Sequence, residues 1–286
     1  MSRVSAYVLG LEKNFRGSDL LGTLVDHGIA TRTIWGLDVS LFTPEYLDSL
    51  IDQEKCKLIL GRSLSYYELS CALGHLEMYE EFLRDASEWG LFLEDDACLR
   101  PEFQSLLNRI SDLNFPVVLS LASSRDVRFE PRPFPFHNEN PNDGSFKDFF
   151  LCAIPPVLAH GYLMNRAAAQ IAVHTLRGKK IYSPADFPFE FRNLVPFFAS
   201  ETEYVGVRET KSIIEESRVK TYELKTSGST KKSIQRRTRV VIDYSGLGVL
   251  KAKKMGISGR FYYHEKIRMR KFYKKYRKSL LGKSES

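Results

Sequence analysis

Long apolar runs are missing from this sequence. No stretch reaches the roughly 18 apolar residues of a membrane-spanning helix, and the start, MSRVSAYVLG, has no apolar signal core with a small-residue cleavage site. Cysteines are also few: the chain has 4 in 286 residues, and none are spaced as C-x-x-C, the spacing of many zinc and redox sites. We therefore expect a cytoplasmic protein whose thiols are buried and carry no chemistry.

Acidic side chains are scarce at the C-terminal end. Residues 225–286 hold 19 Lys and Arg against 3 acids, a charge of +16, whereas residues 1–224 hold 23 bases against 32 acids, a charge of −9. The net +7 is therefore the sum of two opposite parts. This layout excludes a protein that binds nucleic acid over its whole surface. It predicts one folded domain over 1–224 and a basic appendage over 225–286.

Strands and helices alternate in the acidic part. Residues 4–9 predict a strand, the leucines at 20, 21 and 24 a helix that stops at Gly28, and residues 31–35 a second strand. A short helix is expected at 44–51 and then a loop as far as Arg62. This alternation favours an α/β fold with a mainly parallel sheet covered on both faces.

Ser65 begins the clearest predicted helix, because leucines recur at helical spacing as far as Leu83. Ser65 and Glu68 fit the capping box S-x-x-E, which gives Glu68 a structural role. Further helices are expected at 101–113 and 166–176 and further strands at 116–121, 151–154 and 161–164. Residues 123–148 have no periodicity and predict a long loop that could cover a site.

Three consecutive carboxylates, Glu94, Asp95 and Asp96, follow a predicted buried strand at 89–93. The carboxyl edge of an open α/β sheet is where such folds bind ligands. Mutual repulsion between the carboxylates requires a counter-charge, which Mg²⁺ or Mn²⁺ would supply. A solvated acidic turn is the structural alternative. The cluster alone fits sugar transfer, phosphate hydrolysis or nucleotidyl transfer equally well.

Further motifs give a more specific prediction. The segments RSL at 62–64, YELSCALGHL at 67–76, GLFLEDDA at 90–97, AHGYL at 159–163 and SPAD at 183–186 together resemble glycosyltransferase family 25. This family contains bacterial lipooligosaccharide galactosyltransferases and collagen-galactosyltransferase relatives. The resemblance covers about residues 3–215. It departs from the family pattern at Ser70, where Gly is usual, and at Gly74, where Ser is usual.

The resemblance implies a GT-A-type nucleotide-sugar-binding sandwich and an inverting transfer, with UDP-galactose as the common donor and a saccharide or glycolipid as acceptor. An inverting transfer needs a base for the acceptor hydroxyl, and we expect Asp186 in this role, with Glu68 as second choice. Asp96 with Glu94 is expected to hold the Mn²⁺ or Mg²⁺. The residues expected to contact nucleotide or substrate are Asp38, Arg62, His75, Glu94, Asp95, His160 and Tyr162.

Each of these residues also has a structural alternative: Glu68 and Asp186 as helix caps, His75 as a hydrogen-bonded core residue, and Arg62 as a partner of Glu68.

In the basic appendage, apolar and aromatic side chains at 269, 272, 273, 276 and 280 share one face of a predicted helix. A basic amphipathic helix suits an anionic membrane surface, which predicts a peripheral protein on the inner face of the cytoplasmic membrane. The alternatives are a solvated helix, a helix packed on the acidic domain, and a nucleic-acid-binding segment.

Overall fold

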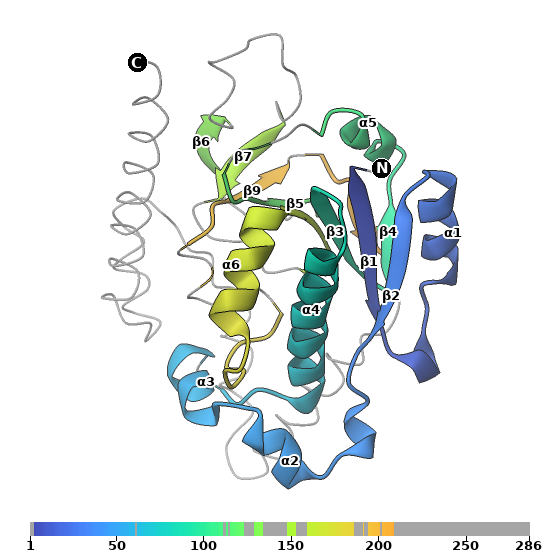
Figure 1. The fold of residues 1–286 in the computed structure, drawn as a ribbon. Helices are drawn as coiled ribbons and strands as arrows, with labels where there is room; N and C mark the ends of the chain where they lie inside the picture. Colours follow the sequence, from blue (N-terminus) through green and yellow to red (C-terminus); the bar gives the residue numbers. More distant parts are fainter. Residues whose placement is uncertain are drawn as a thin grey trace, which may run out of the picture. The chain divides into compact units, whose positions relative to one another are not determined.

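The computed structural model describes most of the predicted acidic domain (Figure 1). The described residues are 3–60, 62–110, 113, 115–122, 129–133, 148–152, 159–185, 191, 194–200 and 202–208. The basic appendage and its boundary at residue 225 lie outside them, so the division into two domains stays a prediction. No helix among the described residues is both long and apolar enough to cross a membrane.

Within the described residues, eight strands form a sheet in the order β2-β1-β3-β8-β5-β9-β7-β6 (Figure 1). Strands β8 and β7 run against the other six, so the predicted mainly parallel sheet is confirmed. A separate antiparallel pair joins β4 to β10. The strands are β1 (Val4–Gly10), β2 (Ala30–Trp35), β3 (Trp89–Glu94), β4 (Ala97–Leu99), β5 (Val118–Ser120), β6 (Phe129–Pro133), β7 (Phe149–Cys152), β8 (Gly161–Asn165), β9 (Phe197–Ser200) and β10 (Val205–Val207).

Helices cover both faces of this sheet, which confirms the α/β class. Helix α1 connects β1 to β2, and α4 precedes β3 on the other side of β1. Because parallel crossovers are right-handed, these two helices lie on opposite faces. Helix α6 lies beside α4 (Figure 1). The helices are α1 (Ser18–Asp26), α2 (Pro44–Ser49), α3 (Gln53–Leu60), α4 (Tyr66–Arg84), α5 (Phe103–Leu107), α6 (Arg166–Leu176) and the 3-10 turns η1 (Glu12–Asn14) and η2 (Val39–Leu41).

The core is centred on β1 and β3. Every residue of β1 is buried, and so is every residue of β3 except Glu94 at its end. Continuous burial of this kind is typical of strands covered on both faces. Aromatic rings fill the layer under α4: Phe92 stacks on Tyr7 at 5.6 Å and on Tyr162 at 5.2 Å between ring centroids. This packing fixes the strand ends that carry the polar residues.

Helix α4 packs closely on β1 at Gly74. Its start is the predicted capping box: the Ser65 hydroxyl accepts from the Glu68 amide at 3.3 Å, and the Glu68 carboxylate accepts from the Ser65 amide at 3.0 Å. In the middle of the helix, a Cβ on Gly74 would lie 2.4 Å from a methyl group of Leu9. The absence of a side chain at Gly74 therefore permits this close approach.

Three predicted elements were wrong in extent. Residues 53–60 form α3 instead of a loop, and the Asp52 carboxylate accepts from the Lys55 amide at 3.0 Å, as a helix-capping residue does. Of the helix expected at 101–113, the described residues form only α5. The segment 123–148, expected to be a loop, contains β6, which pairs with β7 at the edge of the sheet.

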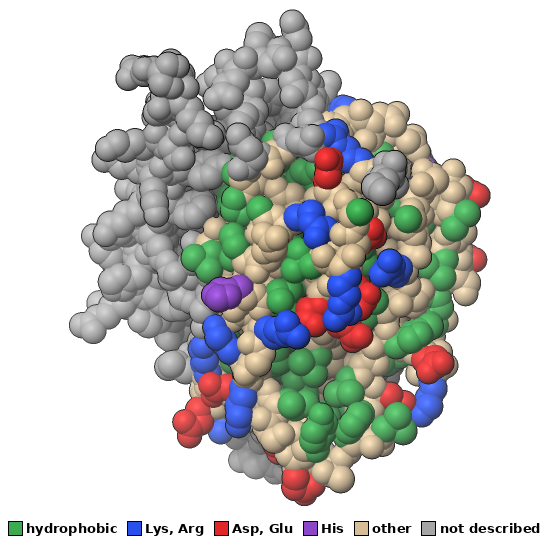
Figure 2. All heavy atoms as spheres, viewed as in Figure 1, with side chains coloured by type: hydrophobic (Ala, Val, Ile, Leu, Met, Phe, Trp, Pro, Cys, Tyr) green, Lys and Arg blue, Asp and Glu red, His purple; other side chains and the backbone are tan. Residues whose placement is uncertain are grey.

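The face of the domain over α4 and α6 carries mixed charge (Figure 2). Glu80 and Glu81 on α4 form ion pairs with Arg84 on the same helix, with Arg177 just after α6 and with Arg32 on β2. Most of these side chains are well exposed, so each pair contributes at most about 1 kcal/mol to stability. These ion pairs therefore contribute little to the stability of the domain.

Candidate functional site

A pocket opens at the carboxyl ends of β1 and β3. From β1 the chain continues to β2 on one side and then returns to β3 on the other side of β1, so the strand order reverses between β1 and β3. Open α/β sheets bind their ligands at such switch points. The hollow measures about 670 Å³ including space open to solvent, within the usual range for small-molecule sites. Its lining residues are Leu9, Gly10, Leu11, Asn14, Arg16, Gly36, Tyr67, Ser70, Cys71, Glu94, Asp95 and Asp96.

The structure brings all three predicted carboxylates to this pocket and supplies a counter-charge from the chain itself. Arg16 donates to Asp95 through its guanidinium at 2.7 Å and through its backbone amide at 3.0 Å. The same guanidinium lies 3.4 Å from Asp96. Asp95 is therefore occupied in holding the loop after β1, while Asp96 is only weakly neutralised.

Asp96 has an unsatisfied acceptor. Its side chain is 14% exposed, and its Oδ1 is buried without a hydrogen-bond partner. Burial, reinforced by the charges of Glu94 and Asp95 and opposed by Arg16, raises the pKa of Asp96 to about 6. A buried carboxylate that lacks a partner is costly when ionised. Asp96 thus has both the free oxygen and the excess negative charge that a cation would compensate.

These features fit a hard divalent cation. Mg²⁺ and Mn²⁺ prefer carboxylate oxygens and need only one or two of them from the protein when a diphosphate supplies the rest. Asp96, with its unpartnered Oδ1, and Glu94, at the end of β3, both line the pocket. The predicted pair of metal ligands is therefore chemically suitable, and metal binding stays a prediction.

Glu94 also faces two side chains of α4. Its Oε1 lies 3.7 Å from Cys71 Sγ and 3.5 Å from His75 Nε2. Burial acts to raise the pKa of Glu94, but the imidazoles of His75 and His160 and the Cys71 thiol outweigh it and hold that pKa below its usual value. The face of α4 that bears Cys71 and His75 therefore borders the site.

The His75 ring is held in a buried polar chain. Its Nδ1 lies 2.7 Å from the Tyr162 hydroxyl, which lies 2.7 Å from the Tyr79 hydroxyl. His75 and Tyr162 are nearly fully buried, and their rings stack at 5.8 Å between centroids. Both predicted contact residues thus have structural partners, with only Nε2 of His75 turned toward Glu94.

Glu68 and Arg62 form a closed unit. Arg62 donates to both carboxylate oxygens of Glu68, at 2.6 and 2.7 Å, and the Glu68 side chain is 1% exposed. Together with the capping box, this is the structural alternative for both residues. A role of Glu68 as base stays a prediction, but its carboxylate is already saturated with donors in this arrangement.

Asp38 and His160 lie outside the lining of this pocket. Asp38 caps η2 and forms an ion pair with Lys13 at 2.8 Å; these hydrogen bonds, first from Lys13 and then from Ser40, lower its pKa to about 2. His160 is buried, which lowers its pKa, and its carbonyl accepts from the Glu94 amide at 3.2 Å. Neither side chain lines the pocket between β1 and β3.

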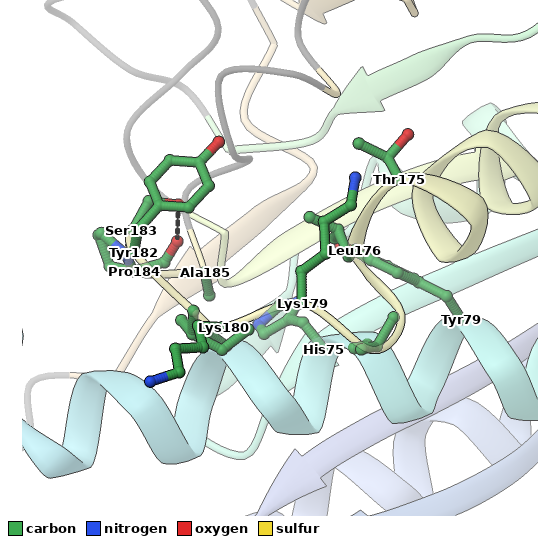
Figure 3. A pocket seen from close by; sticks show the side chains of 13 residues that line it. His75, Tyr79, Thr175, Leu176, Lys179, Lys180, Tyr182, Ser183, Pro184 and Ala185 are labelled. Atoms are coloured by element: carbon green, nitrogen blue, oxygen red, sulfur yellow. Dashed lines mark hydrogen bonds between the residues drawn. The ribbon is translucent and has the colours of Figure 1, made fainter. Parts of the chain in front are cut away.

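A second pocket lies between α4 and the segment that follows α6 (Figure 3). His75 lines it together with Tyr79, while Lys179 and Lys180 contribute ammonium groups. Its last lining residue is Ala185, which directly precedes Asp186 in the chain. Asp186 itself lies outside the described residues. The remaining lining residues are Ala72, Leu76, Thr175, Leu176, Ile181, Tyr182, Ser183 and Pro184.

The sequence interpretation missed Arg16 and its anchor, Arg208. The backbone amide of Arg208 donates to the Asp96 carbonyl at 2.9 Å, and its guanidinium donates to the Arg16 carbonyl at 3.2 Å. A signal for Arg16 existed, because the loop after the first strand of such a sheet lies at the ligand-binding edge. The expectation of buried thiols holds for Cys56 but is wrong for Cys71 and Cys98, which are half-exposed. These three cysteines form no disulfide.

Comparison with models of known protein families gives a match. The model of the family described as "Glycosyltransferase family 25 (LPS biosynthesis protein)" matches residues 6–188. No curated protein matches significantly. Among solved structures, A197 from STIV is 10% identical over 73% of this chain and 95% of that chain, with a TM-score of 0.37. A glycosyltransferase involved in the glycosylation of the major capsid of PBCV-1 is 12% identical over 77% and 98%, also with a TM-score of 0.37. These TM-scores are too low to support an assignment, which rests on the family match.

Proposed function

Because this chain belongs to glycosyltransferase family 25, a family described by its part in LPS biosynthesis, we propose that it moves a hexose, with inversion, from a UDP-sugar to a saccharide hydroxyl. Galactose is the sugar we favour, and lipooligosaccharide or another surface polysaccharide is the acceptor we favour. A glycosyltransferase of this family uses a nucleotide-sugar donor and an acceptor. The donor sugar, the linkage and the stereochemistry are the parts that we propose.

The observation that carries this proposal is the pocket at the switch point. It combines a buried, unpartnered Asp96 oxygen with Glu94 and the cationic Arg16. Asp96 and Glu94 would hold Mn²⁺ or Mg²⁺, and such a cation neutralises the charge that develops on a diphosphate leaving group. Arg16 adds a positive charge to the same wall. These are the requirements for departure of a nucleoside diphosphate.

We place the acceptor in the second pocket. His75 lines this pocket and also lies 3.5 Å from Glu94 in the first, so the two hollows adjoin the same side chain. Lys179 and Lys180 suit an acceptor that carries an anionic group. The base is expected to be Asp186, whose neighbour Ala185 lines this pocket. An in-line displacement requires the acceptor hydroxyl to approach the sugar from the side opposite the diphosphate.

The donor is tested first by thermal unfolding of the full chain with a panel of nucleotide sugars and Mn²⁺, because a bound donor stabilises the folded state by mass action. The stabilising sugar is then used in a transfer assay with truncated lipooligosaccharide. We expect Asp96→Ala to abolish transfer while Asp26→Ala, at an exposed position of α1, keeps it. Full activity of Asp96→Ala, or undiminished activity in chelator, would contradict the metal assignment. Phosphate release without any glycoside product would identify a phosphohydrolase instead.

The base is tested by Asp186→Asn, which keeps the shape of the side chain. We expect turnover to be lost while thermal stabilisation by the donor is retained, because the carboxylate acts on the acceptor proton and not on donor binding. If turnover is unchanged, Asp186 is not the base.

The basic appendage supports a further part of the proposal, attachment to the anionic inner surface of the cytoplasmic membrane. Its support is the charge of +16 over residues 225–286 together with the apolar stripe of the helix predicted there from the sequence. Each Lys or Arg near an anionic surface contributes about 1 kcal/mol. The full chain should sediment with anionic vesicles, and a chain ending at residue 224 should not. Loss of oligonucleotide binding with unchanged vesicle binding would favour a nucleic-acid partner.

A further inference from the structure

We propose that Cys71, His75 and Glu94 form a binding site for a thiolate-preferring transition-metal ion, with Zn²⁺ as the natural candidate. This site shares Glu94 with the proposed hard-cation site, and it uses Cys71 and His75 where that site uses Asp96. Among the described residues, the three side chains are the group that places potential ligand atoms close together: Sγ, an imidazole nitrogen and a carboxylate oxygen all lie within 4.8 Å of one another. Zn²⁺ binding at these three residues does not depend on which sugar is transferred.

The spacing matches a tetrahedral centre. With Zn–S near 2.3 Å and Zn–N and Zn–O near 2.0 Å, neighbouring ligand atoms of a tetrahedron lie about 3.3 to 3.6 Å apart. The Cys71 Sγ to Glu94 Oε1 distance is 3.7 Å, and the His75 Nε2 to Glu94 Oε1 distance is 3.5 Å. Both distances therefore agree with the spacing of ligand atoms in a tetrahedral zinc site to within a few tenths of an ångström, without any movement of the side chains.

The positions in the fold are equally suitable. Cys71 and His75 are four residues apart on α4, so their side chains project from the same face of the helix. Glu94 ends the neighbouring strand β3. An ion at this point would join the helix to the sheet with three protein ligands from two rigid elements.

An independent observation points to a ligand at this position. His75 is 2% exposed, and its Nε2 is buried without a hydrogen-bond partner although it faces Glu94. The other ring nitrogen, Nδ1, lies 2.7 Å from the Tyr162 hydroxyl. When Nδ1 donates that bond, Nε2 presents a lone pair toward a carboxylate, and two acceptors face each other. A cation between them removes this conflict.

The surrounding contacts resemble those of metal-binding histidines. Such residues donate their second ring N–H to an oxygen that fixes the tautomer and the ring orientation. Tyr162 occupies this place, and its hydroxyl is fixed in turn by the Tyr79 hydroxyl at 2.7 Å. The buried polar chain therefore orients Nε2 toward the proposed ion.

The donor set defines the class of metal. Thiolate and imidazole ligands favour Zn²⁺ and similar ions over Mg²⁺ or Mn²⁺. Cys71 and Glu94 line the pocket at the switch point, so the fourth coordination position opens toward that pocket. Three protein ligands with an open position are the arrangement of zinc sites that bind an exogenous ligand.

The test uses Co²⁺ as a spectroscopic probe for Zn²⁺. Co²⁺ added to the full-length metal-free protein is expected to give a thiolate-to-metal charge-transfer band and the visible bands of tetrahedral coordination, both displaced by Zn²⁺. Zn²⁺ should also protect Cys71 from alkylation, measured by peptide mass spectrometry, with the half-exposed Cys98 as internal control. The proposal is overturned if wild-type protein gives no charge-transfer band or if Cys71 stays as reactive as before.

Variants locate the ion. Cys71→Ser and His75→Gln should each remove the band and weaken Zn²⁺ binding at least tenfold, whereas Cys98→Ser and Asp96→Asn should retain both. Tyr162→Phe should bind Zn²⁺ about 10- to 100-fold more weakly, the usual effect of losing an outer hydrogen bond. A band that persists in Cys71→Ser, or disappears in Asp96→Asn, would place the metal elsewhere. Because no transfer is measured, these results are separate from those that test the proposed function.

Discussion

Replacing Asp96 by Asn should stabilise the metal-free protein while it removes the expected metal ligand. Asn has nearly the same shape, so the pocket is preserved, but the buried negative charge is lost. In the wild-type protein, burial and the neighbouring carboxylates raise the pKa of Asp96 from its ordinary value of 3.8 to about 6. The folded protein therefore binds more protons than the unfolded chain between about pH 4 and 6, and its stability falls as the pH rises through that window.

The magnitude follows from the pKa shift. A shift of about two units corresponds to about 3 kcal/mol, since each unit is worth about 1.4 kcal/mol. The advantage of Asp96→Asn should therefore be near zero below about pH 4, about 1.5 kcal/mol at about pH 5, and close to 3 kcal/mol above about pH 7. Loss of the 3.4 Å contact with Arg16 reduces the gain slightly.

Urea denaturation in chelator, at pH 4, 5 and 7.5, measures this difference directly. The exposed Asp26→Asn is the control and should show no comparable pH dependence. Added Mn²⁺ should narrow the gap at pH 7.5, because the ion stabilises only the protein that retains the carboxylate. An Asp96→Asn protein that is no more stable than wild type at pH 7.5, or whose advantage does not change with pH, would refute the electrostatic reasoning.

Three further substitutions test the packing and charge arguments by urea denaturation. Arg16→Gln should lower the free energy of unfolding by about 3 kcal/mol, because the buried Asp95 carboxylate loses the guanidinium and keeps only the backbone amide of residue 16. Arg32→Gln, in an exposed pair, should cost less than about 1 kcal/mol, and equal costs would contradict this reasoning. Gly161→Ala should destabilise the folded protein by about 1 to 3 kcal/mol, since the new Cβ would lie 2.5 Å from a buried valine methyl group. Gly22→Ala, in open space on α1, should stabilise the folded protein. Glu68→Gln, which removes the charge that pairs with Arg62, should lower the free energy of unfolding by about 3 kcal/mol. Each folded molecule should keep its turnover. A stable but inactive protein would instead favour Glu68 as the base.

Most of the regular elements could be predicted because their signals are local. The alternation of apolar segments gave the α/β class, and the S-x-x-E pattern gave the capping box at Ser65, which depends on four consecutive residues. Helix α3 was missed although Asp52 supplies a local cap. The three carboxylates were correctly placed at the edge of the sheet, because they directly follow the strand that carries them.

The sequence by itself determined the family motifs, the strand that ends in carboxylates and the capping box that begins α4. Only the tertiary structure decided how these parts meet. Arg16 reaches Asp95 across 79 residues of sequence, and no local pattern encodes such a contact. The order of the strands brings α4 and β3 together, so that Glu94 faces the helix instead of solvent. Local propensity sets what each segment becomes, whereas long-range packing sets which charged groups share one pocket.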